Sequence, residues 1–271
     1  MKKILLLLNV LLFFQLSAQK NLASKKWQND LRFFQNTIHK DYSHLFVKTT
    51  RTIFDKEVET FYKDIPNLKS HEIIVGFSKL ISLFKYGHTY LSFNQKAYKF
   101  SQLPFNLHQF KDGIYIQGTH KKYSKSVGAK VIAIEGKPIS EALKAIEPTV
   151  ESENSQYFKA YGINNLRYPE ILHAQNIIKT LQNTITLTLE KNGKTFKQTF
   201  AIMEKGESMP KQRGYVHQNE NWLDARDQTK TPLYLKNLDR IYFFEYLPKE
   251  KALYVRHSRV ADDAKESTEK F

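Results

Sequence analysis

The tripeptide Gly87-His88-Thr89 carries the side chain in this sequence that is best suited to proton transfer. An imidazole acts as a general base near neutral pH when a nucleophile lies within hydrogen-bond distance. His88 stands between a segment with helical apolar spacing and the β-prone segment Tyr90–Phe93. Such a junction would hold the imidazole between two regular elements, so His88 is the candidate general base.

A helix is predicted directly before this motif. Apolar residues recur at helical spacing from Ile73 to Phe84, and Ser70 is the expected N-cap. Gly87 is expected to end the helix in a left-handed conformation, and Tyr90–Phe93 is expected to begin a strand. Both elements would then fix the backbone on either side of the imidazole.

Residues 1–18 have the order of a secretory signal peptide. Lys2 and Lys3 precede the apolar run Ile4–Leu16, and small residues end it at Ser17-Ala18. The run is short for a membrane span, and the chain contains no cysteine that could carry a lipid. We therefore expect an exported protein, periplasmic or extracellular, with no stable membrane anchor after cleavage.

Composition narrows the possible functions. The absence of cysteine excludes disulfides, thiol nucleophiles and thiolate metal sites. The formal net charge is +15, and removal of Lys2 and Lys3 leaves 40 basic residues against 27 acidic ones, or +13. The lysines are scattered, and no basic arm, zinc finger or aromatic RNA-binding signature is found. We expect a solvated basic surface, no nucleic-acid partner, and contacts with anionic polymers or peptides.

Residues 19–100 are predicted to form an N-terminal helical domain that ends in the strand after His88. Its first helix has an apolar face from Trp27 to Ile38, and its second runs from about Ile53 to Tyr62. Histidines also occur in this region, but their spacing fits no pair of ligands on one helix face. No metal site and no cofactor are therefore predicted from the three histidines considered, His39, His44 and His71.

Residues 101–206 are predicted to form a β-rich domain with a helical insertion at 157–178. The segment Gly128–Ile139 gives a buried strand, a tight turn and a short return strand, and Ser140 is expected to cap the next helix. Hairpins are expected at Lys111–Gly113 and at Asn192-Gly193. This order resembles a PDZ-like domain, a fold that captures extended peptides at a sheet edge.

The complete order of segments resembles the tail-specific, or C-terminal processing, serine peptidases, in the branch related to the core of the tricorn protease. The phrases Leu253-Tyr254-Val255 and Asp262-Asp263 add to the similarity. The resemblance implies an α+β fold with a small helical domain, a PDZ-like domain, and residues 207–271 as the incomplete start of an α/β peptidase core. It implies that His88 is the general base, and that the partners are peptides or unfolded chain ends.

One part of the family pattern is missing. The family's nucleophilic serine follows a Gly-rich strand and turn, and neither of the last serines, Ser258 and Ser267, has that context. Residues 261–271 read as an uncapped acidic helix start, so the chain is interpreted as truncated there. We therefore expect no hydrolysis by this chain alone. Two alternatives are a non-catalytic peptide-binding module and one half of a split enzyme that another chain completes.

Overall fold

The structure is a computed structural model that describes residues 2–212, 214–263, 267 and 269. Side chains are described from Leu22 onward, except those of Gln212 and Gln228. The predicted signal peptide, residues 1–18, therefore lies outside the residues with described side chains. Within the described part of the chain, no helix has the length and apolar content needed to cross a membrane.

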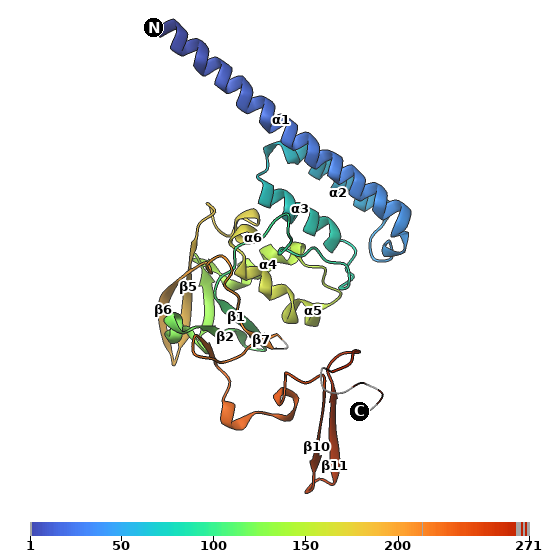
Figure 1. The fold of residues 1–271 in the computed structure, drawn as a ribbon, viewed down its shortest axis with the longest axis vertical. Coiled ribbons are helices and arrows are strands. Elements are labelled where there is room, and N and C mark those ends of the chain that lie inside the picture. The colour runs from blue at the N-terminus through green and yellow to red at the C-terminus, as the bar shows by residue number, and fades with distance from the viewer. Residues whose placement is uncertain (1, 213, 264–266, 268, 270–271) are drawn as a thin grey trace.

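The protein belongs to the mixed α+β class that the sequence predicts. A helical N-terminal region is followed by a mostly antiparallel sheet with short helices packed against it (Figure 1). The helices are α1 (Lys2–Asp41), α2 (Arg51–Asp64), α3 (Ser70–Ser82), α4 (Ile139–Ile146), α5 (Ser155–Ala160) and α6 (Pro169–Ala174). Short 3-10 helices connect them, and the one used below is η5 (Gly162–Arg167).

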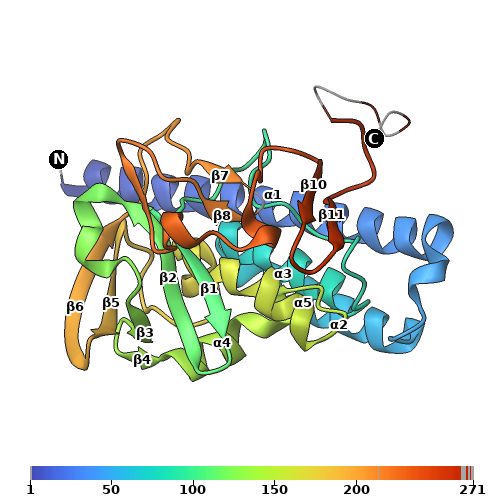
Figure 2. The same cartoon turned by 90° about the horizontal axis from the view of Figure 1, so that it is seen from below.

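Helices α1, α2 and α3 share one apolar core, which includes the fully buried Leu31 and Phe54. Helix α3 has apolar side chains on two faces. Its residues Ile73 and Leu80 join this core, whereas Ile74 and Val75 join the core beneath the sheet. Figure 2 shows α3 between the long helix α1 and the helices that pack on the sheet. The helical region is therefore joined to the β-rich region through the two faces of α3.

The main sheet has seven strands and runs in the order β1-β2-β3-β5-β6, with β4 beside β3 and β9 beside β2. All of its pairs are antiparallel. Its inner face packs on helices α3, α4 and α6. The strands are β1 (Phe105–Phe110), β2 (Gly113–His120), β3 (Lys130–Ile134), β4 (Lys137–Pro138), β5 (Thr184–Lys191), β6 (Lys194–Ala201) and β9 (Trp222–Asp224).

The turns of this sheet confirm the predicted hairpins. Asn192 and Gly193 both have positive φ, 52° and 70°, as a two-residue hairpin turn of type I′ requires. Glu135 and Gly136 turn the chain in the same way, with φ of 48° and 79°. A two-residue loop also joins β1 to β2 at the position predicted for the first hairpin.

The chain around His88 differs from the prediction. Residues 90–93 form no strand, and the nearest pairing is an isolated bridge between Asn94 and Lys99. Helix α3 ends at Ser82, and Lys85, with φ of 48°, takes the left-handed conformation predicted for Gly87. These residues join none of the sheets. Phe93 instead stacks on Phe100, with ring centroids 4.9 Å apart, across an irregular loop.

Two predicted N-caps are also wrong by one or two residues. Helix α3 begins at Ser70, so Lys69 is its N-cap, and the Glu72 carboxylate accepts a hydrogen bond from the Lys69 backbone N–H at 2.7 Å. Helix α4 begins at Ile139, which places Ser140 inside the helix and Pro138 at the cap. The preset φ of proline favours this earlier start.

After the main sheet, two small hairpins follow, one of them formed by β7 (Lys211–Gln212) and β8 (Tyr215–Val216). The other pairs β10 (Tyr242–Leu247) with β11 (Ala252–His257) and lies apart from the main sheet (Figure 1). Ala261–Asp263 are not helical, contrary to the predicted helix start, and the residues after them lie largely outside the described part. Asp263 is buried and accepts a hydrogen bond from the Ile241 backbone N–H at 2.7 Å.

Candidate functional site

His88 lies on an exposed loop, Tyr86–Thr89, which we call the His88 loop. The Thr89 backbone N–H donates to the Tyr86 carbonyl at 2.9 Å and closes the turn. Among the described side chains and backbone groups, none forms a hydrogen bond with the His88 imidazole, and Tyr86 is an aromatic neighbour at 5.9 Å between ring centroids. The imidazole therefore has access to solvent and to a bound ligand, but no hydroxyl partner in place.

The backbone of this loop is held by a segment far away in the sequence. The Glu153 carboxylate accepts a hydrogen bond from the Gly87 N–H at 2.9 Å, and the Tyr157 hydroxyl donates to the Gly87 carbonyl, also at 2.9 Å. A Cβ at position 87 would lie 2.3 Å from the Tyr157 ring. Glycine is therefore required here for close approach, and not for the left-handed conformation predicted from the sequence.

The partly buried carboxyl group of Glu151 lies next to this contact. Glu151 Oε1 lies 3.0 Å from the Tyr157 hydroxyl. Burial raises the pKa of Glu151, and burial together with the nearby carboxylate raises the pKa of Tyr157. The hydroxyl thus stays protonated at neutral pH and remains a donor to the His88 loop.

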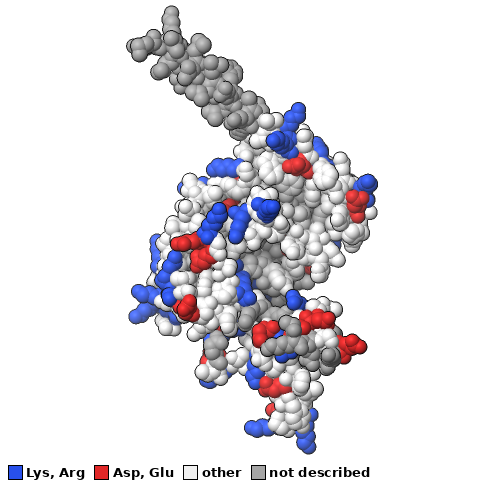
Figure 3. Space-filling model, in the orientation of Figure 1, with Lys and Arg blue, Asp and Glu red and all other residues white. Residues whose placement is uncertain are grey.

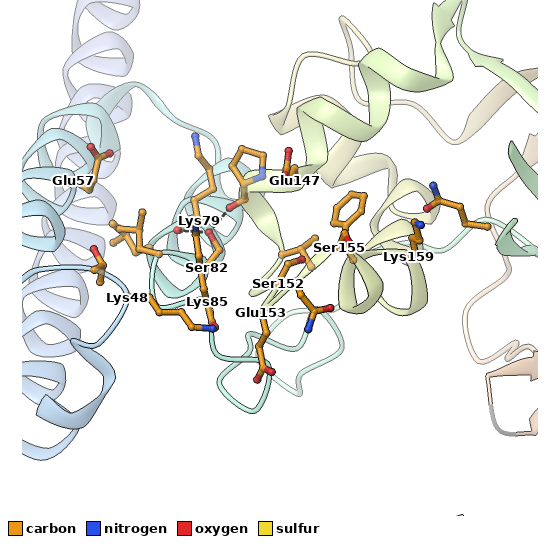
Figure 4. Close-up of a pocket in the computed structure, with 18 residues that line it drawn as sticks. Lys48, Glu57, Lys79, Ser82, Lys85, Glu147, Ser152, Glu153, Ser155 and Lys159 are labelled. Carbon is orange, nitrogen blue, oxygen red and sulfur yellow. Dashed lines mark hydrogen bonds between the residues drawn. The ribbon is translucent and has the colours of Figure 1, made fainter. Parts of the chain in front are cut away.

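The largest cavity near the loop lies between the helical region and residues 147–159. It has a volume of about 830 Å³, and Figure 4 shows Lys48 and Lys85 on one side of it and Ser152 and Glu153 on the other. The Ser82 hydroxyl donates to the Pro148 carbonyl at 2.6 Å and ties the two walls together. Gln109 of strand β1 also lines this space, which we call the Gln109 cavity.

Strand β1 is an edge strand of the main sheet. The backbone of Ile116 bonds to the β3 side, because its N–H donates to the Ala129 carbonyl and its carbonyl accepts from the Gly128 N–H. Tyr115 must then bond to His108, and the backbone groups of Gln109 point away from β2. Within the described chain, no backbone hydrogen bond joins β1 to a segment other than β2. The side-chain Oε1 of Gln109 is buried and likewise has no partner there.

A second pocket of about 490 Å³ lies at the start of β1 and contains a buried cation, Arg167. Arg167 is only 4% exposed, and burial lowers its pKa to about 10, so it remains charged at neutral pH. Its Nη2 donates to Gln102 Oε1 at 3.1 Å, whereas its Nε is buried without a partner. No described carboxylate forms an ion pair with it. A buried guanidinium without an ion pair is a candidate partner for an anionic ligand, although Glu204 and Glu207 also line this pocket. We call this space the Arg167 pocket.

The three histidines that were rejected as a metal cluster do not converge. His39 contacts Asp55 and Arg51, each at 2.7 Å, within the helical region, and His44 lies next to Tyr42. His71 instead contacts His173, a residue from the insertion. Lys and Arg side chains are spread over the face drawn in Figure 3 and do not gather in one stripe.

No local sequence pattern indicates the residues that complete these sites. Tyr157 and Glu153 reach the His88 loop across 70 and 66 positions of sequence. Arg167 belongs to an Arg-Tyr-Pro segment that has no catalytic motif. A single arginine in an insertion is normally solvated, and only the packing of η5 against β1 makes it a buried charge.

No model of a known protein family matches the chain, and no curated protein is significantly similar to it. The resemblance to tail-specific peptidases therefore stays a prediction based on the motifs.

Proposed function

We propose that this exported chain binds the carboxyl-terminal ends of extended peptides on a PDZ-like scaffold related to the tail-specific serine peptidases. The observation that carries the proposal is the position of the Arg167 pocket at the start of the unpaired edge strand β1. A peptide that adds to this edge forms main-chain hydrogen bonds with β1, and its carboxylate meets the unpaired guanidinium.

The polarity of such a peptide follows from the two ends of β1. The Arg167 pocket lies before Phe105, and Gln109 lies near the other end of the strand. A peptide with its carboxylate at Arg167 therefore runs antiparallel to β1 and leaves the sheet at the Gln109 cavity. Glu153 lines that cavity and also accepts a hydrogen bond from Gly87, so the upstream part of the peptide approaches the His88 loop.

Two short elements, the 3-10 helix η5 and helix α5, lie beside this path. Helix α5 lies next to β1 and buries none of its own side chains completely. Helices of this length are marginal without tertiary packing. We infer that α5 moves when a peptide adds to the edge of β1.

In this proposal His88 is the candidate general base, and binding proceeds without hydrolysis by this chain alone. Peptide cleavage requires a nucleophile within hydrogen-bond reach of the base, and none of the described hydroxyl groups bonds to His88. The alternative is a peptide-binding module with no catalytic role, in which the same pocket and edge strand are used. Reconstitution with a serine-bearing chain, followed by His88→Ala, distinguishes the two: loss of turnover supports the base, and unchanged turnover removes it.

The binding proposal is tested with one unstructured fluorescent peptide of about ten residues, made with a free carboxylate or a carboxamide. We expect the carboxylate form to bind at least about tenfold more tightly, since a charge-assisted hydrogen bond contributes roughly 1.5–3 kcal/mol. Arg167→Met should abolish this preference. It should not unfold the protein, because removal of an uncompensated buried charge in favour of an apolar chain is close to neutral.

The matched control is Lys194→Met, which removes one positive charge from the exposed end of β6. This variant should keep the preference for the free carboxylate. Equal affinity of the two peptides for the unmodified protein would contradict the proposal, as would equal loss in both variants. Circular dichroism of Arg167→Met separates loss of the pocket from loss of the fold.

A further inference from the structure

His71, Glu72 and His173 bring three metal-ligating side chains together at the contact between α3 and α6. His71 and Glu72 belong to the first turn of α3, and His173 belongs to α6. Their ligating atoms all lie within 4.8 Å of one another. We propose that this cluster binds one divalent transition-metal ion of the Zn²⁺ type, which joins the helical region to the insertion of the β-rich region.

The distances fit such an ion. His71 Nε2 lies 3.0 Å from His173 Nδ1, and His173 Nδ1 lies 3.4 Å from Glu72 Oε1. Zinc binds imidazole nitrogen and carboxylate oxygen at about 2.0–2.2 Å with tetrahedral geometry, which places neighbouring ligand atoms about 3.3 Å apart. Small adjustments of the side chains would therefore accommodate the ion, and a water molecule would take the fourth position.

Neighbouring groups orient and bury the ligands. The other oxygen of the Glu72 carboxylate accepts the Lys69 N–H at 2.7 Å, which fixes the direction of the carboxylate. His173 is only 10% exposed at its side chain. The negative charge of Glu72 offsets the unfavourable position of a cation at the N-terminus of α3.

The spacing of the ligands explains why the sequence did not predict the site. His71 and His173 are 102 positions apart, and His71-Glu72 is an adjacent pair that matches no helical ligand spacing. No metal site was predicted because His71 was compared only with His39 and His44, and the structure places those two histidines elsewhere. Two histidines and one carboxylate are nevertheless a common donor set for zinc.

The test uses the full chain, treated with a chelator and then titrated calorimetrically with ZnCl₂ alone near pH 7.5. We expect one saturable site and a midpoint of thermal unfolding that rises with the zinc concentration. Co²⁺ should give the visible absorption of a four-coordinate ion with nitrogen and oxygen ligands. His173→Gln should weaken zinc binding by at least about a hundredfold, since even outer-shell changes weaken metal binding by roughly 10–100-fold.

Two further variants make the result decisive. Glu72→Gln keeps an acceptor for the Lys69 N–H, so it should preserve helix α3 while it weakens zinc binding by at least about tenfold. His217→Gln removes an exposed histidine outside the cluster and should bind zinc like the unmodified chain. The absence of saturable binding would overturn the proposal. Equal zinc affinity in the unmodified chain, His173→Gln and Glu72→Gln would also overturn it, because it would show adventitious binding only.

Discussion

The Glu151 carboxyl group contacts the Tyr157 hydroxyl, which in turn contacts the His88 loop. Its pKa is raised by burial, against the smaller opposing effect of its hydrogen bonds. The folded protein therefore holds this proton to higher pH than the unfolded chain does. Through this group, stability is greatest below the unfolded pKa and falls as the pH rises through the folded pKa.

Glu151→Gln should therefore change the pH dependence of the free energy of unfolding. The amide can donate to the Tyr157 hydroxyl oxygen or accept from its O–H, and it removes the ionisation. As the pH is raised from about 4 to about 7, the free energy of unfolding of the variant should therefore increase relative to that of the unmodified protein. Urea unfolding at both pH values measures the difference. Parallel pH dependences of the two proteins would contradict the assignment of Glu151.

Only part of the site around His88 could be predicted from the sequence. The position of His88 on a loop after a helix was predictable from the apolar spacing before it. Its partners were not, because Glu153 and Tyr157 reach Gly87 only after the insertion folds back on α3. The role predicted for Gly87 was wrong. The left-handed residue is Lys85, and the glycine is required by the ring of Tyr157.

At the scale of elements, the contact between α2 and α3 depends on Gly76. A Cβ at this position would lie 2.3 Å from the ring of Phe61, which is buried in the core of the three helices. Phe61 packs edge-on against Phe77, with ring centroids 5.5 Å apart, so the ring has little freedom to move. The glycine thus permits close approach of the two helices.

Gly76→Ala should therefore destabilise the protein, although alanine is the better helix former. Overpacking costs about 1–3 kcal/mol and the gain in helix propensity is about 1 kcal/mol, so a net loss of roughly 1 kcal/mol is expected. Chemical unfolding measures it. In a Phe61→Leu background the same substitution should become neutral or stabilising, because the shorter side chain leaves room for the methyl group. An equal loss in both backgrounds would place the cause elsewhere.

Elements that carry their own local signals were predicted well. The Asn192-Gly193 hairpin and the turn at Glu135-Gly136 follow from Asn192 and the two glycines, which accept positive φ. The strand expected at residues 90–93 does not form, because β-propensity describes a fit to a sheet position and these residues pair with no strand. The pairing of β9 with β2 joins segments about a hundred positions apart, and no local pattern indicates it.

At the scale of the whole molecule, the edge of β1 connects features that belong to different regions. The Arg167 pocket adjoins its beginning, the Gln109 cavity adjoins its end, and the His88 loop is held by the same segment that lines that cavity. The net charge of +15 favours an anionic ligand, and the lysines of the Gln109 cavity have acidic neighbours that moderate this preference. We propose that this arrangement guides a peptide from its carboxyl end toward His88.

The central claim is that a peptide adds to β1 as a further strand, and one pair of variants tests it most directly. Gln109→Pro removes an N–H that points away from β2, which an edge strand tolerates, whereas Gln109→Ala removes only the side chain. Fluorescence anisotropy with a single labelled peptide bearing a free carboxylate measures the affinity of each. We expect Gln109→Pro to weaken binding by at least about fivefold relative to Gln109→Ala, as the loss of one hydrogen bond of roughly 1 kcal/mol implies. Equal affinities in two folded variants would contradict addition of the peptide to this edge.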